Sequence, residues 1–142
     1  LRLGVKYLKE ILDNLNLKSF LKTSGGKGYH ICIPFKNNLT WKKFYKISED
    51  IANIIENTHS ELFTTNNRKE KRKNKIFIDY LRNQKSATFV APYSVRLRKN
   101  APVSMPIAWN ELDKIKPNEI TIYKAIKRLK KKDPWKDFFT SN

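Results

Sequence analysis

The 142-residue chain has the length of one domain, and its 39% hydrophobic and 12% aromatic content is enough to build a core. No run of about 18 apolar residues occurs, so neither a membrane-spanning helix nor a membrane partner is expected. The net charge of +17 and the pI near 10.0 indicate a polyanionic partner, with nucleic acid as the leading expectation. On charge alone the alternatives are a membrane surface and compositional bias, because 23 lysines against 7 arginines also place charge on solvated faces that bind nothing.

The N-terminal half is expected to form two helices and two short strands. Apolar residues recur at helical spacing over 3–16, which predicts an amphipathic helix. Strands are predicted over 19–23 and 29–35 on either side of a glycine-rich turn. Thr40 fits the N-cap of a second, longer helix. The single cysteine, Cys32, lies between two isoleucines, which indicates a buried strand residue in a reducing, cytoplasmic setting.

The C-terminal half is expected to be more irregular. A strand is predicted over 76–81, with a neighbouring strand at 87–90. The segment 91–106 holds three prolines without helical periodicity and is expected to be extended or irregular. Helices are predicted over 109–115, over 121–131, and after Asp133 as N-cap with Pro134 at the first helical position. Together these elements predict an α+β fold, a mixed and mostly antiparallel sheet flanked by helices, in a single domain over 1–142.

Three of the four glycines fall within four residues, in the glycine loop Thr23-Ser24-Gly25-Gly26-Lys27-Gly28-Tyr29-His30. Glycine allows a tight turn and a close approach of backbone N–H groups to an anion. Ser24, Lys27 and His30 add a hydroxyl, an ammonium and an imidazole, so the loop predicts a phosphate site. The spacing matches neither the Walker motif nor the dinucleotide-binding fingerprint. For His30 the alternative is a structural hydrogen bond at the end of a strand.

Asp79 is singled out among the 13 acidic residues because it directly follows the apolar run 76–78. A carboxylate in such a run needs either exposure to solvent or a cation, which would be Arg82, Arg96 or a divalent metal ion. The pattern leaves these alternatives open. A magnesium or manganese site usually needs more than one carboxylate, and no second one lies nearby in the sequence.

A basic, hydrophilic segment over 66–75 precedes the predicted strand. It is expected to be a loop, and two interpretations of it stay open. It is either a flexible solvated excursion or an electrostatic arm for a nucleic-acid backbone, carried by Arg68, Lys71, Arg72 and Lys73.

Five segments, in this order, resemble the polymerase domain of bacterial ligase D, a non-homologous end-joining member of the archaeo-eukaryotic primase superfamily. They are the glycine loop, Lys75-Ile76-Phe77-Ile78-Asp79-Tyr80-Leu81-Arg82-Asn83, Val90-Ala91-Pro92-Tyr93-Ser94-Val95-Arg96-Leu97-Arg98, Ala101-Pro102-Val103-Ser104-Met105-Pro106 and Asp133-Pro134-Trp135. The resemblance runs from about Ser19 to the end. It implies the C-terminal portion of a primase-polymerase-like fold.

The resemblance implies roles for individual residues. Asp79 would be a catalytic ligand of Mn²⁺ or Mg²⁺, and His30 would be catalytic as well. Contacts to the phosphates of the incoming nucleotide would come from Ser24, Gly25, Gly26, Lys27, Gly28, His30, Arg82, Arg96 and Arg98. The implied activity is template-directed and end-extending transfer of a nucleotide from an NTP or dNTP to a DNA 3′-hydroxyl. The implied partners are DNA ends, a Ku-type protein and a DNA ligase domain.

One motif of that family is missing from these 142 residues. The first motif, an Asp-x-Asp pair that supplies the other metal ligands, is expected to lie upstream of Leu1. The chain by itself is therefore expected not to polymerise DNA. The alternative function is a non-catalytic DNA- or nucleotide-binding remnant of such a polymerase.

Overall fold

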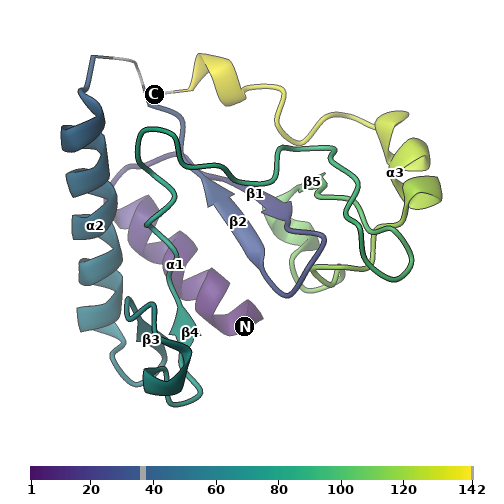
Figure 1. Cartoon of the computed structure of the whole chain (residues 1–142). Coiled ribbons are helices and arrows are strands. Elements are labelled where there is room, and N and C mark those ends of the chain that lie inside the picture. The colour runs from purple at the N-terminus through teal and green to yellow at the C-terminus, as the bar shows by residue number, and fades with distance from the viewer. Residues whose placement is uncertain (36–37, 142) are drawn as a thin grey trace. The chain divides into compact units, whose positions relative to one another are not determined.

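The computed structural model describes residues 1–35 and 38–141 (Figure 1). The chain divides into two compact units, each described by itself below. The first unit comprises residues 1, 3–11 and 37–89, and the second comprises residues 2, 12–36 and 90–142. Helices together with an antiparallel sheet confirm the expected α+β class. The single domain over 1–142 stays a prediction.

The first unit packs helices against a short two-stranded parallel sheet. The predicted N-cap at Thr40 is confirmed, because the Thr40 Oγ1 accepts a hydrogen bond from the Lys43 N–H at 3.4 Å. Gly4 allows a close helix–sheet contact, since a Cβ there would lie 2.5 Å from Ile76 Cδ1 and 3.1 Å from Phe63 Cε1. The elements are most of α1 (Arg2–Asn14), α2 (Trp41–Thr58), β3 (Phe63–Thr64) and β4 (Ile76–Phe77).

The second unit is built around a three-stranded antiparallel sheet with the order β2-β1-β5 (Figure 1). The central strand is buried along its whole length, with Leu21 facing Ile107 across one pair and Lys22 facing His30 across the other. Both Leu21 and Ile107 are almost fully excluded from solvent and contribute to the core of this unit. The elements are β1 (Phe20–Thr23), β2 (Tyr29–Cys32), β5 (Pro106–Ile107) and α3 (Ile122–Leu129).

Three short 3₁₀ turns complete the described elements, at Lys69–Lys71, Trp109–Glu111 and Phe138–Thr140. The 3₁₀ turn at Trp109–Glu111 stands in place of the longer helix that the sequence predicts over 109–115. Among the described residues, no helix combines the length and the apolar composition needed to cross a bilayer.

The strand predicted over 76–81 is wrong in its extent and in its partner. Strand β4 ends at Phe77 and pairs in parallel with β3, while residues 87–90 form no strand. Backbone bonds from Ile76 N–H to Leu62 O and from Ile78 N–H to Thr64 O hold this pairing. Apolar content predicted the position of the strand, but a non-local partner decided its length.

Asp133-Pro134-Trp135 ties the C-terminal segment to the central strand. The Trp135 N–H donates to Asp133 Oδ1 at 2.8 Å, but residues 134–137 form turns and the 3₁₀ turn begins only at Phe138, so the helix predicted directly after Asp133 is wrong. The indole N–H of Trp135 donates to the Leu21 carbonyl at 2.9 Å, and its ring stacks on Phe138 with centroids 5.0 Å apart. This motif is therefore structural: it fixes the last residues of the chain against β1.

Candidate functional site

The glycine loop connects β1 to β2 and bonds largely to itself. Ser24 Oγ accepts hydrogen bonds from the N–H groups of Gly26 at 3.1 Å and Gly28 at 3.2 Å. The Ser24 N–H donates to the Gly28 carbonyl, and the Gly25 N–H donates to the Pro117 carbonyl. These four amides already have acceptors within the protein, which differs from the expectation that the loop amides surround an anion.

The Ser24 hydroxyl organises the loop and still has a hydrogen to donate. A serine oxygen has two lone pairs, and both are used by the two glycine amides. Its O–H hydrogen is therefore suited to an external acceptor such as a phosphate oxygen. The phosphate contact that the sequence predicts for Ser24 is compatible with this geometry and stays a prediction.

Two arginine side chains lie against the glycine loop, and Gly25 makes room for one of them. Gly25 has a left-handed backbone with φ +65°, and a Cβ at this position would lie 2.5 Å from Arg96 Cγ. At Gly26 a Cβ would lie 3.6 Å from Arg98 Cζ, which places that guanidinium beside the loop. The structure thus brings together five of the predicted nucleotide-binding residues: Ser24, Gly25, Gly26, Arg96 and Arg98.

His30 lies on β2, partly buried and opposite Lys22 on β1. Burial, followed by the positive charges of Lys22 and Arg96, lowers the pKa of the His30 imidazole to about 4. The ring is therefore neutral near pH 7 in the chain without ligand. An anion beside it would offset these positive charges and favour the imidazolium form. Lys27 is exposed at the tip of the loop.

Lys22 is a residue of this region that the sequence analysis missed. Its side chain is completely excluded from solvent, and Nζ donates to the Val90 carbonyl at 2.8 Å and to Ser104 Oγ at 2.7 Å. Burial lowers the pKa of this ammonium to about 8; Cys32 counteracts that effect and Arg96 adds to it. A lysine within an otherwise buried strand was the available signal, hidden by the abundance of lysine in the chain.

Cys32 is half-buried, and its thiol is free. Burial raises the pKa of that thiol, so it stays protonated at neutral pH. The expected strand position is confirmed, whereas the expected burial is only partial.

Asp79 and Arg82 belong to the first unit, and both are exposed. The Asp79 carboxylate lies two residues beyond β4, so exposure to solvent, one of the alternatives that the sequence left open, is what the structure shows. Among the described residues, no group of three or more histidine, cysteine or acidic side chains is placed to hold a metal ion. One exposed carboxylate is an incomplete ligand set for a divalent cation.

The basic segment divides into a structural residue and exposed ones. Arg72 Nη2 donates to the Asn67 carbonyl at 2.7 Å, and its guanidinium lies 3.9 Å from the centre of the Phe77 ring. Arg72 therefore holds the segment against β4. The side chains of Arg68, Lys71 and Lys73 are exposed and available to a polyanion.

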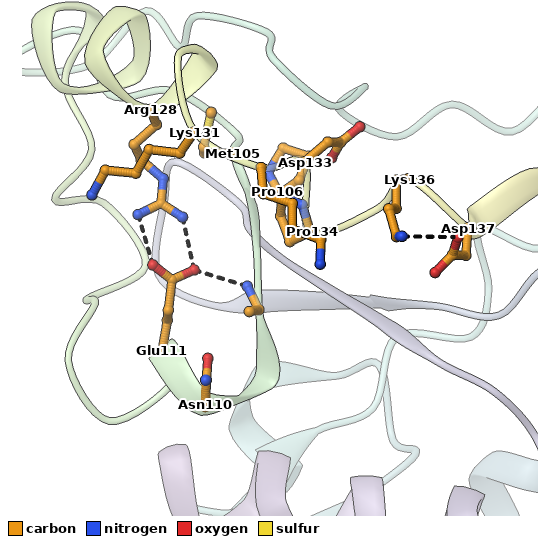
Figure 2. A pocket seen from close by; sticks show the side chains of 12 residues that line it. Met105, Pro106, Asn110, Glu111, Arg128, Lys131, Asp133, Pro134, Lys136 and Asp137 are labelled. Atoms are coloured by element: carbon orange, nitrogen blue, oxygen red, sulfur yellow. Dashed lines mark hydrogen bonds and ion pairs between the residues drawn. The ribbon is translucent and has the colours of Figure 1, made fainter.

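A groove in the second unit, of about 550 Å³, was not expected from the sequence (Figure 2). Arg128 forms a two-pronged ion pair with Glu111 at 2.9 and 2.8 Å, and the Ala108 N–H donates to the same carboxylate. The hydrogen bonds from Arg128, and then the one from the Ala108 N–H, hold the pKa of Glu111 below its usual range, against partial burial, which raises it. This closed charge pair braces α3 against Trp109–Glu111.

Comparison with solved structures defines the class to which this fold belongs. The polymerase domain of Mycobacterium tuberculosis ligase D, solved in complex with DNA, superimposes with a TM-score of 0.85. That match is 25% identical in sequence and covers 98% of this chain and 49% of the other. The fold is that of about half of a ligase D polymerase domain. Residues 4–135 match the family described as LigD, primase-polymerase domain, and the chain belongs to this family.

Curated relatives agree with this assignment. The multifunctional non-homologous end joining protein LigD of Pseudomonas aeruginosa is 37% identical over 132 residues, which is 90% of this chain. The bifunctional non-homologous end joining protein LigD of Bacillus subtilis is 33% identical over 135 residues. The chain spans 16% and 22% of the lengths of these two proteins. The resemblance drawn from the five sequence segments is confirmed.

Proposed function

We propose that the chain is the nucleotide-phosphate-binding portion of a DNA end-joining polymerase domain. The observation that carries this proposal is the packing of Arg96 and Arg98 against the glycine loop. Membership of the LigD primase-polymerase family supports it, as does the likeness to a polymerase domain solved with DNA. The substrates would be a DNA 3′-hydroxyl and an NTP or dNTP.

In the proposed reaction the 3′-oxygen of the DNA attacks the α-phosphorus and loses its proton to solvent water. The bond from that phosphorus to the bridging oxygen breaks, and pyrophosphate leaves with the negative charge. Arg96, Arg98 and Lys27 would bind the triphosphate and neutralise this charge, because fixed cations stabilise charge that develops in the transition state. The Ser24 hydroxyl would donate to a phosphate oxygen. An anion bound beside His30 would raise the pKa of its imidazole.

Asp79 is proposed as a ligand for Mn²⁺ or Mg²⁺, although the described residues alone do not complete such a site. The 142-residue sequence holds no Asp-x-Asp pair, so the chain by itself is expected to bind a triphosphate without extending a primer. Arg68, Lys71 and Lys73 would contact the backbone of a DNA end. A Ku-type protein and a DNA ligase domain are the proposed protein partners, in the cytoplasm.

The alternative function is a non-catalytic DNA- or nucleotide-binding remnant, and the incomplete set of metal ligands among the described residues favours it. Primer extension with manganese and nucleoside triphosphates separates the two functions. The chain alone should give no product, whereas mixing it with a separately expressed segment carrying Asp-x-Asp should restore extension. The same mixture with Arg96→Ala should be impaired, and the mixture with the exposed control Lys114→Ala should be active. No extension in the mixture would favour the remnant, and robust extension by the chain alone would contradict the incomplete metal site.

A further inference from the structure

Lys22 occupies the point in the second unit where three segments meet. Its Nζ reaches the carbonyl of Val90 and the hydroxyl of Ser104, and its backbone lies in the central strand β1. The Ser104 hydroxyl in turn donates to the Thr23 carbonyl at 2.9 Å. One ammonium therefore connects β1 to the segment that begins at Val90 and to the segment before β5.

The two segments held by Lys22 form a small ladder that carries Arg96. The Ser104 N–H donates to the Ser94 carbonyl at 2.9 Å, and the Arg96 N–H donates to the Pro102 carbonyl at 2.8 Å. A bridge between Val95 and Val103 lies between these bonds. From this ladder the Arg96 stem packs onto Gly25. Hydrogen bonds therefore connect Lys22 to the ladder, and the contact between the Arg96 stem and Gly25 connects the ladder to the glycine loop.

We propose that Lys22 is a positioning residue that holds Arg96 against the glycine loop and thereby sets the affinity of this site for a triphosphate. The inference rests on the proposed function and deepens it. Lys22 is buried, so it acts through Arg96 rather than by touching the ligand.

The choice of lysine at this position supports a role beyond packing. Burying an ammonium is costly, and an apolar side chain of similar volume often stabilises a core equally well. The lowered pKa of Lys22 reflects that cost. His30, Cys32 and Arg96 are the titratable and charged groups whose electrostatics are coupled to this ammonium. A lysine whose burial is costly, and whose ammonium bonds two separate segments, is expected where the position of these two segments relative to each other matters for function.

The test uses the chain itself and inorganic triphosphate, with affinity measured by isothermal titration calorimetry at fixed ionic strength. Lys22→Met should weaken binding about tenfold, since a lost hydrogen bond to a charged group is worth on that order. The exposed control Lys114→Met removes the same charge and should bind like the unmodified chain. In the Arg96→Ala background, Lys22→Met should cost less than about twofold more, because two residues acting through one contact are not additive.

Each outcome of these titrations either supports or contradicts the positioning role of Lys22. Unchanged affinity in Lys22→Met, or a full additional loss in the Arg96→Ala background, overturns the positioning role while leaving the proposed function standing. Absence of triphosphate binding by the unmodified chain overturns the proposed function and this inference together. If circular dichroism shows that Lys22→Met is unfolded, Ser104→Ala takes its place, because it removes one Nζ partner and keeps the ammonium. Its loss of affinity must then also disappear in the Arg96→Ala background.

Discussion

Gly25 and Gly28 lie three residues apart in one loop, yet the structure gives them different tasks. Gly25 has φ +65° and leaves space that the Arg96 stem occupies, whereas a Cβ at Gly28 would meet nothing within 4 Å. The left-handed backbone and the close contact both make a side chain costly at Gly25. A glycine-rich motif therefore contains one indispensable glycine and one that sterics alone do not require.

Gly25→Ala is expected to lower stability by about 1–2 kcal/mol from backbone strain alone and to displace Arg96, which weakens triphosphate binding. Gly28→Ala, the matched control, should keep both properties close to those of the unmodified chain. Thermal unfolding and calorimetric titration with inorganic triphosphate measure the two effects. Equal losses in both variants would show that the loop as a whole, rather than the Gly25–Arg96 contact, requires glycine.

His30 gives a pH-dependent signature of the same site. Its folded pKa of about 4 lies below the ordinary value of 6.5. The unfolded chain therefore binds more protons between these pH values, so the contribution of His30 to stability is complete above pH 6.5 and is lost as pH falls toward 4. Proton NMR should show an imidazole that titrates near pH 4 and disappears in His30→Asn. Added triphosphate should raise that pKa, and a titration near 6.5 without ligand would contradict the proximity of Lys22 and Arg96.

At the scale of the elements, local patterns found most of the helices and strands but not their partners. The capping hydroxyl of Thr40 and the period of α1 act over a few residues, so the sequence displays them directly. The pairing of β4 with β3 joins residues more than ten positions apart, and the sequence between them does not encode it locally. Hence the strand over 76–81 was placed correctly at its start and wrongly at its end.

In the candidate site, too, local features could be predicted from the sequence and contacts between distant segments could not. Glycines and basic residues that stand close in sequence identified the loop, because their rarity and clustering are visible without a structure. The neighbours Arg96 and Arg98 followed from the family resemblance, and their packing on Gly25 and Gly26 required coordinates. Lys22 could not be separated from 22 other lysines until its burial was known. Burial is a property of the folded chain, so the amino-acid composition cannot show which of the lysines is buried.

At the scale of the whole molecule, a net charge of +17 predicts affinity for any polyanion and does not by itself identify a binding face. Among the exposed cations of the basic segment are Arg68, Lys71 and Lys73, while Arg72 is engaged with Asn67 and Phe77. The three lysines after α3, residues 130–132, carry the same total charge and are equally exposed. These two clusters allow local contact to be distinguished from general attraction.

Binding to a duplex DNA end should weaken steeply with salt, because each neutralised phosphate releases counterions. If Arg68, Lys71 and Lys73 each contact a phosphate, changing all three to Gln should reduce the slope of log K against log salt by up to about 2.7. The same change at Lys130, Lys131 and Lys132 alters net charge equally and should leave the slope nearly unchanged. Fluorescence anisotropy between low and physiological salt measures both slopes. Equal reductions in the two variants would mean that the charge acts diffusely, and salt-insensitive binding would exclude a role for either cluster.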